Sequence, residues 1–269
     1  MTHIPNLLAA LAVFACLSGA APATAQPEVF TANLRVGWQM QNGSQMVAIH
    51  LNLRDGWKTY WRAPGDAGIP PSFDWAGSRN VKAVRFHWPR PQVFSLAGMQ
   101  TFGYAQELVL PVEIVPLDPS KPVEVMAAVD LGVCSDICVP ASFRVAAVLP
   151  RPGAEDGAIR RALRQRPSTA QEAGVSAARC ELTPQKDGVK LTAILQLPSL
   201  GGDEVVVVEA GLPGVWVSAA DVTRQGKELR AEVDMVSTAG GPIAVQRDAI
   251  LLTVLGKNRA VEIQGCAAP

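Results

Sequence analysis

The feature that most constrains this fold is an alternation of apolar and polar residues with a period of two. In residues 30–38 and 47–53 every second side chain is apolar, and Asn42-Gly43 lies between the two runs. Successive side chains of a β-strand point to opposite faces, so this period indicates strands with one buried and one solvated face. Asn-Gly favours a tight hairpin turn, which predicts that the two strands pair with each other.

The same alternation recurs along both halves of the 269-residue chain. The 23 glycines and 21 prolines supply frequent turns, and this composition favours short strands over a helical bundle. Such alternation is typical of antiparallel sandwiches. We therefore predict an all-β fold of two β-sandwich domains. The further strands are expected at 84–88, 108–114, 123–131 and 143–149 in the first half, and at 189–197, 229–235, 250–255 and 261–263 in the second.

The break between the two halves falls at Pro150-Arg151-Pro152-Gly153. Residues 154–165 then carry a helical pattern, so we interpret 150–175 as a linker with a short helix. The expected domains are a first sandwich over 26–149 and a second over 176–269. Each has a length of roughly 100 residues or a little more, which suits a single domain.

Residues 1–25 predict a secretory signal peptide that is cleaved near Ala25. They contain no Lys, Arg, Asp or Glu, and an apolar run over 7–17 precedes Ala23-Thr24-Ala25. An apolar core followed by small residues is the pattern of an exported precursor. In a rival interpretation, Cys16 is a lipid-anchored N-terminus.

For the rest of the chain, hydropathy argues against a membrane-spanning segment, and the distribution of charge argues against binding to nucleic acid. No later stretch approaches the ~18 apolar residues that a membrane span needs. The 24 basic and 24 acidic residues balance, and no Lys/Arg cluster runs along the sequence. This distribution argues against nucleic acid as a partner.

Four cysteines remain after the predicted signal peptide, and an even number in an exported protein suggests disulfides. The alternation returns from Val175, so we place Cys180 on the first strand of the second domain, and Cys266 lies just beyond the last strand. We predict a structural disulfide between them. On the chain-entropy model, closing so long a loop stabilises a domain by roughly 4–5 kcal/mol.

Cys134 and Cys138 are separated by only three residues, between an expected strand that runs in and another that runs out. This spacing predicts two sulfur atoms that face each other at a hairpin tip. Closing so short a loop stabilises little, and exposed disulfides tend to be the labile ones. We therefore predict a redox-active disulfide that works without a cofactor or a metal.

Three other interpretations of the Cys134/Cys138 pair stay open. The pair could be a local staple, or part of a purely structural exported sandwich. It could also bind Cu(I) through soft thiolates, with Met99 and His87 as further ligands in a copper-tolerance module.

Asp136 lies between the two cysteines, and no Lys, Arg or His flanks them in the sequence. A nearby carboxylate disfavours a thiolate, so we expect neither thiol to be strongly activated by itself. The pair should react mainly when the cysteines of a partner dock.

Two segments of the first domain, 54–79 and 89–106, lack the period of two and are predicted to be long loops, where function tends to lie. Residues 94–103 are apolar and contain two glycines, which suggests a flap over the disulfide. In the alternative interpretation, its phenylalanines only close the end of the sandwich. The proposed cap residues are Phe94, Leu96, Met99 and Phe102. The aromatic residues of the other segment are interpreted as packing residues; they are Trp57, Tyr60, Trp61 and Trp75.

Two segments of the first domain, one within 54–79 and the other around Cys134 and Cys138, together resemble a known family. Residues 56–71, GWKTYWRAPGDAGIPP, are similar to the signature of the N-terminal periplasmic domain of DsbD-type thiol:disulfide interchange proteins. They are most similar to the branch called suppressor of copper sensitivity B. The segment that ends in Cys138-Val139-Pro140 resembles the redox hairpin of that family. The resemblance covers roughly 28–149, and residues 176–269 match only in general character.

The resemblance implies an immunoglobulin-like sandwich in the periplasm with thiol:disulfide oxidoreductase activity of the protein-disulfide reductase type. By position, Cys138 would attack and form mixed disulfides, and Cys134 would resolve them. Residues 94–103 fall where the family has its cap. The implied partners are a membrane-embedded electron donor protein and a periplasmic client that is thioredoxin-like or disulfide isomerase-like. The resemblance also connects the chain with cytochrome c biogenesis.

The sequence departs from the family in two ways. Its two cysteines are closer together than in the best-known members. It also lacks the transmembrane segments and the thioredoxin-like C-terminal domain of the full-length forms, so the expected electron donor is a separate protein.

Overall fold

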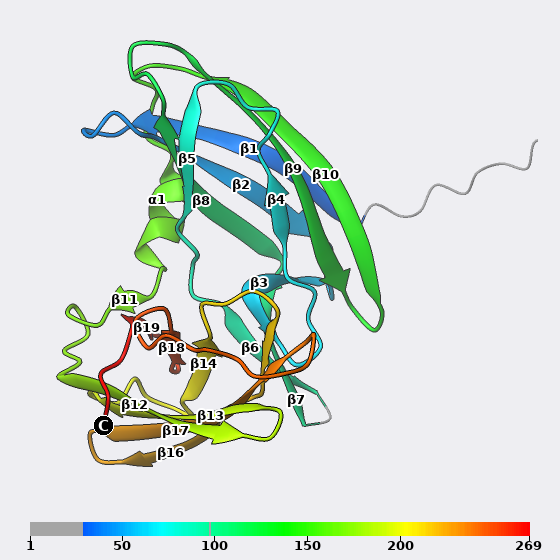
Figure 1. The fold of residues 1–269 in the computed structure, drawn as a ribbon. Coiled ribbons are helices and arrows are strands. Elements are labelled where there is room, and N and C mark those ends of the chain that lie inside the picture. The colour runs from blue at the N-terminus through cyan, green and yellow to red at the C-terminus, as the bar shows by residue number, and fades with distance from the viewer. Residues whose placement is uncertain (1–28, 97) are drawn as a thin grey trace, which may run out of the picture.

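The computed structural model describes residues 29–96 and 98–269 (Figure 1). The predicted signal peptide over residues 1–25 lies outside the described residues, and so does Cys16. In the described part the chain forms β-strands and one short helix, so the predicted all-β class is confirmed. No helix within these ranges has the length and apolar character that crossing a bilayer requires.

One sheet of the first domain has the strand order β1-β2-β8-β5. β1 and β2 pair antiparallel, so the hairpin predicted at Asn42-Gly43 is confirmed. Gly43 has a φ of 83°, a left-handed conformation that glycine adopts without strain. The four strands are β1 (Phe30–Gln39), β2 (Gln45–Leu53), β5 (Val81–Phe86) and β8 (Glu107–Pro116).

The second sheet has the order β10-β9-β3-β7-β6, with β4 pairing along β9. The prediction that 54–79 and 89–106 are long loops is wrong, because the first contains β3 and β4 and the second contains the β6–β7 hairpin. β3 shows no alternation because Thr59, Tyr60 and Trp61 are all buried. The six strands are β3 (Lys58–Gly65), β4 (Ser72–Asp74), β6 (Gln92–Leu96), β7 (Met99–Ala105), β9 (Val123–Cys134) and β10 (Cys138–Leu149).

The core of the first domain lies between these two sheets. Every second residue of β2, β8 and β9 contributes to it, and Trp61 of β3 is fully buried there. Removing these apolar surfaces from water is the main source of stability for such a sandwich. The core therefore fixes the position of β3 and β9, the two strands that carry the functional residues.

The linker contains α1 (Gly157–Arg164), which packs on the outer face of the β1-β2-β8-β5 sheet. Asp156 caps the helix by accepting hydrogen bonds from the N–H groups of Ala158, at 2.8 Å, and Ile159, at 2.9 Å. Its carboxylate also pairs with Arg35 at 2.8 Å. The helix is shorter than the predicted 154–165 because this cap sets its first turn.

The second domain is also a sandwich of two sheets. Cys180 of β12 and Cys266, just beyond β19, form a disulfide that joins the two sheets, with a Cα–Cα distance of 5.6 Å. This is the pairing that the sequence predicts. One sheet has the order β11-β19-β18-β14, made of β11 (Ser168–Thr169), β19 (Ala260–Gln264), β18 (Leu251–Leu255) and β14 (Val205–Glu209). The other has the order β12-β13-β17-β15 with β16 beside β17, made of β12 (Ala177–Gln185), β13 (Gly188–Gln196), β17 (Glu228–Ser237), β15 (Val215–Val217) and β16 (Asp221–Gln225).

Arg62 of β3 links the two domains. Its guanidinium group donates hydrogen bonds to Glu209 at 2.9 Å and to Glu262 at 2.7 Å, and it lies 4.3 Å from the centre of the Trp61 ring. Apolar residues of β14, β18 and β19 extend the core of the first domain at the same place. The second domain is therefore tied to the strand that borders Cys134.

Candidate active site

Cys134 and Cys138 lie at the tip of the long β9–β10 hairpin (Figure 1). Cys134 is the last residue of β9, Cys138 is the first residue of β10, and the two are directly paired across the strands. They form a disulfide with a Cα–Cα distance of 4.1 Å. We call it the tip disulfide. Its position at the end of a two-stranded hairpin is the one expected from the spacing of the two cysteines.

The two sulfur-bearing residues differ in their exposure to solvent. Cys134 is 1% exposed, whereas Cys138 belongs to the exposed tip of the hairpin. Ile137, the residue before Cys138, is 67% exposed. A protein that approaches from solvent can therefore reach Cys138 and cannot reach Cys134 directly.

Tyr60 of β3 contacts both sulfur atoms. Its hydroxyl oxygen lies 3.0 Å from Sγ of Cys134 and 3.3 Å from Sγ of Cys138. The side chain is buried, and this burial raises the pKa of the Tyr60 hydroxyl, so the group stays protonated near neutral pH and can donate a hydrogen bond. From the sequence Tyr60 is expected only to pack, so its contact with the two sulfur atoms is a result that only the fold reveals.

Lys58 is a second residue that the sequence analysis missed. It pairs with Cys134 across β3 and β9, and directly paired residues present their side chains on the same face of a sheet. Its ammonium group lies 4.6 Å from the centre of the Phe94 ring and 3.4 Å from Oγ1 of Thr101. The fold thus places a lysine at the strand position that pairs with Cys134, whereas Asp136 is the charged residue that lies between the two cysteines in the sequence. Lys58 and Tyr60 are two residues apart on one strand, and this spacing could have indicated their shared face.

The loop that follows β3 covers the other side of this region. A Cβ atom on Gly68 would lie 2.8 Å from Cδ1 of Tyr60, and one on Gly132 would lie 2.8 Å from Cβ of Ile69. Both positions therefore require glycine for close approach. The loop packs against Tyr60 and against the end of β9, which holds the tyrosine hydroxyl in place against the sulfur atoms.

The proposed cap residues lie on the β6–β7 hairpin. Phe94 contacts Lys58, and Met99 is 45% exposed near the turn. Phe102 is buried in the core, with its ring 6.5 Å from that of Trp61, a placement that matches the alternative interpretation. The side chain of Leu96 lies outside the described part. The function of this hairpin as a cap stays a prediction.

The residues named for the copper interpretation are spread over two sheets. His87 follows β5 and lies 3.5 Å from Glu113 in the β1-β2-β8-β5 sheet, whereas Met99 lies on β7. Within residues 29–96 and 98–269, no group of three or more His, Cys, Asp or Glu side chains is arranged to hold a metal ion. The geometry of the tip disulfide suits thiol–disulfide exchange, because Cys138 is exposed, Cys134 is buried, and the Tyr60 hydroxyl contacts both sulfur atoms.

Comparisons with known proteins point in the same direction. Residues 25–150 match the family model for the N-terminal domain of the thiol:disulfide interchange protein DsbD. The crystal structure of the N-terminal periplasmic domain of ScsB from Proteus mirabilis aligns with 89% of this chain and 92% of that chain, with a TM-score of 0.64 and 23% identity. At this identity the likeness shows a shared fold, and it extends over both domains.

A second solved structure is the DsbD N-terminal domain of Neisseria meningitidis in the reduced form. It aligns with 46% of this chain and 90% of that chain, with a TM-score of 0.28 and 15% identity, and no argument rests on it. No curated protein matches the sequence of this chain.

Proposed function

We propose that this chain passes electrons between two other proteins through the tip disulfide. The match of residues 25–150 to the family model for DsbD N-terminal domains supports this proposal. The electron donor is a membrane-embedded protein, and the acceptor is a periplasmic disulfide protein with a thioredoxin-like or disulfide isomerase-like domain. The chain works in the periplasm, and its resemblance to periplasmic domains supports this location. The two cysteine sulfurs carry the chemistry, and no cofactor takes part.

The reaction begins with the reduced pair. The thiolate of Cys138 attacks one sulfur of the acceptor's disulfide, so a Cys138–acceptor bond forms, the acceptor's own S–S bond breaks, and its second sulfur leaves as a thiolate. The thiolate of Cys134 then attacks Sγ of Cys138 and releases the acceptor's first sulfur, which takes up a proton. Two electrons have passed to the acceptor, and the tip disulfide is formed. The donor's dithiol reverses these steps.

The observation that carries this proposal is the difference in exposure between the two cysteines. Because Cys138 is exposed and Cys134 is 1% exposed, the partner's sulfur should bond to Cys138. Cys134 lies on the neighbouring strand within bonding distance of Cys138. This arrangement supports an attacking role for Cys138 and a resolving role for Cys134.

Tyr60 and Lys58 supply the electrostatics of the step. When a reductant attacks Cys138, the Cys134 sulfur must leave as a thiolate. The hydroxyl of Tyr60, at 3.0 Å, can donate to that thiolate, and the ammonium group of Lys58 lies on the paired residue of β3. Both groups stabilise the negative charge as it develops. They also offset the unfavourable effect of Asp136 that the sequence analysis emphasised.

A trapping experiment tests the assignment. A Cys134→Ala variant cannot resolve a mixed disulfide, so it should retain a partner through Cys138. The partner should be released by dithiothreitol and identified by mass spectrometry. A Cys138→Ala variant is the matched control and should retain none, since its remaining thiol is buried. Capture by the control alone would reverse the two roles, and capture by neither variant would refute the proposed exchange.

A further inference from the structure

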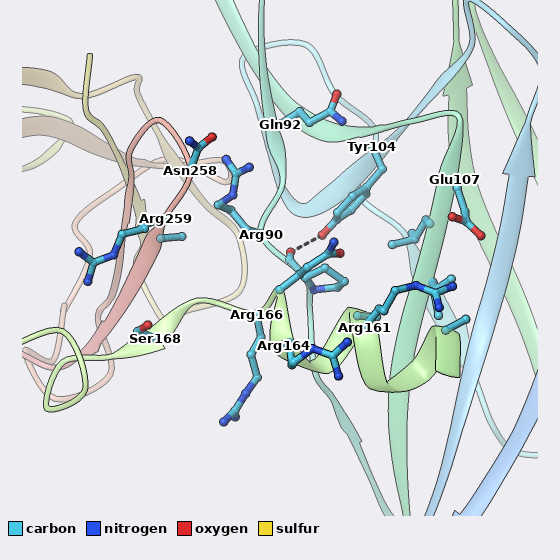
Figure 2. A pocket seen from close by; sticks show the side chains of 17 residues that line it. Arg90, Gln92, Tyr104, Glu107, Arg161, Arg164, Arg166, Ser168, Asn258 and Arg259 are labelled. Atoms are coloured by element: carbon cyan, nitrogen blue, oxygen red, sulfur yellow. Dashed lines mark hydrogen bonds between the residues drawn. The ribbon is translucent and has the colours of Figure 1, made fainter. Parts of the chain in front are cut away.

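A cavity of about 560 Å³ lies where the first domain, the linker and the second domain meet (Figure 2). Its walls come from the segment after β5, from β7 and β8, from α1, and from the turn between β18 and β19. The volume is in the range of sites that bind small molecules. Neither Cys134 nor Cys138 lines this cavity, and the proposed exchange reaction does not use it.

Five arginines line this cavity. Arg90 is half-buried and the other four are exposed. Among the described lining residues there is one carboxylate, Glu107, and its Oε1 already lies 2.8 Å from Nε2 of His50. In the described part of the chain, none of the five guanidinium groups forms an ion pair or a side-chain hydrogen bond. We call this the arginine cavity. Its arginines are Arg90, Arg161, Arg164, Arg166 and Arg259.

This concentration of one charge contrasts with the rest of the molecule. The chain has a formal net charge of zero, and other arginines meet carboxylates at short range, such as Arg35 with Asp156 at 2.8 Å and Arg224 with Glu204 at 2.7 Å. A concave surface lined by one sign of charge focuses the electric field and raises the local concentration of ions of the opposite sign.

The dipole of α1 explains only part of the arrangement. Two of the arginines lie in the last turn of the helix, where the partial negative charge of a helix C-terminus favours cations. The other three come from separate segments: Arg90 precedes β6, Arg166 follows α1, and Arg259 lies in the turn before β19. Their meeting at one cavity is a result of the tertiary fold.

Hydrogen bonds hold the frame of the cavity. The hydroxyl of Tyr104 donates to the carbonyl oxygen of Pro89 at 2.8 Å, and the N–H of Arg90 donates to the carbonyl oxygen of Gln165 at 2.8 Å. The first of these bonds is drawn in Figure 2. Ile159 anchors α1 to the first domain and is fully buried. These contacts hold the backbone at Arg90 and at α1 in place, and in the described part of the chain none of the five guanidinium groups is engaged by another side chain.

We propose that the arginine cavity binds a multiply charged anion that bears phosphate groups. The planar guanidinium fork matches the geometry of a phosphate group through two parallel hydrogen bonds. In Figure 2 the five guanidinium groups lie apart, and those of Arg166 and Arg259 point away from the middle of the cavity, so a ligand that engages several of them carries more than one anionic group. A soluble oligophosphate and the phosphate headgroup of a lipid share this chemistry.

The site touches three parts of the chain, and this has a measurable consequence. A ligand that contacts Arg90, Arg161 and Arg259 bridges the first domain, the linker helix and the second domain. Such a ligand binds the folded arrangement and not the unfolded chain, so it stabilises the fold by mass action. Binding does not depend on the redox state of the tip disulfide, and it should persist in a variant that lacks both Cys134 and Cys138.

Calorimetric titration of the oxidised protein with tripolyphosphate at ~0.15 M salt tests the proposal. The wild type should bind one equivalent and unfold at a higher temperature. The double variant Arg161→Ala/Arg164→Ala should bind at least tenfold more weakly. The matched control is Arg54→Ala/Arg144→Ala, which removes the same charge from two exposed arginines outside the cavity. It should change the affinity by less than twofold.

A second arm distinguishes the two sources of phosphate. Sedimentation with phosphatidylglycerol vesicles measures binding to lipid headgroups, with the same two variants. Loss of binding in the cavity variant alone supports the proposal, and the probe that shows this loss identifies the source. Equal losses in both variants would reduce the effect to general charge attraction and overturn the proposal. Absence of binding to both probes would also overturn it.

Discussion

Replacing Tyr60 by phenylalanine should slow the reduction of the tip disulfide. The variant keeps the buried ring and removes only the hydroxyl, which lies 3.0 Å from Sγ of Cys134. When a small thiol attacks Cys138, the Cys134 sulfur gains negative charge and leaves. In the wild type this developing thiolate accepts a hydrogen bond from Tyr60, and in the variant it has lost that donor.

The size of the effect follows from the worth of one hydrogen bond to a charged group. Such a bond contributes about 1.5–3 kcal/mol. If about half of the charge has developed on the sulfur in the transition state, the loss is about 0.8–1.5 kcal/mol. Since about 1.4 kcal/mol corresponds to a tenfold change in rate, reduction should be slowed by roughly four- to tenfold.

The assay is the pseudo-first-order reduction of the oxidised protein by dithiothreitol, with the thiols at positions 134 and 138 counted by alkylation and mass spectrometry. Tyr104→Phe is the matched control. It also removes a buried tyrosine hydroxyl, but one that donates to Pro89 and not to sulfur. A wild-type rate in Tyr60→Phe, or an equal slowing in the control, would refute the reasoning.

Two further predictions concern charge. Lys58→Met should slow reduction of the tip disulfide by about threefold, since a partly exposed ionic contact is worth up to about 1 kcal/mol. Lys58→Arg keeps the positive charge and should react at the wild-type rate. A wild-type rate in Lys58→Met would show that the ammonium group does not assist the reduction. Asp156→Ala should lower the free energy of unfolding at pH 7 by about 1–2 kcal/mol, as measured in urea. Burial by itself raises the pKa of the Asp156 carboxyl. The hydrogen bonds that the carboxyl accepts from Arg35 and from the first helical turn outweigh this effect and hold the pKa below its usual value. Its contribution is therefore present above the unfolded pKa near 3.9 and lost as the pH falls through the lower folded value. A difference between wild type and variant that does not shrink as the pH is lowered below the unfolded pKa would contradict this.

The local parts of the fold could be predicted because they depend on neighbours in the sequence. The hairpin around Asn42-Gly43 needs only a turn and two alternating strands, and the tip disulfide needs only two cysteines at a hairpin end. Both signals lie within about two dozen consecutive residues. The pairing of Cys180 with Cys266 could also be predicted from the sequence, because the first and last strands of a sandwich are often neighbours.

The rest depends on contacts that the sequence does not display. β3 was predicted to be a loop because Thr59, Tyr60 and Trp61 are buried in succession, and a strand covered on both faces loses its alternation. The contact of Lys58 with the cysteine region arises from the pairing of β3 with β9, about 75 residues away in the chain. The pairing of Arg62 with Glu209 and Glu262 requires both domains to be folded and docked.

The most direct test of the account is equilibration of the protein with glutathione redox buffers, followed by alkylation and mass spectrometry of each cysteine. Cys134 and Cys138 should open together and close again as the buffer is made more oxidising, while Cys180 and Cys266 stay bonded throughout. A tip disulfide that stays closed in every buffer, or two disulfides that open together, would contradict the proposal that Cys134 and Cys138 exchange electrons reversibly.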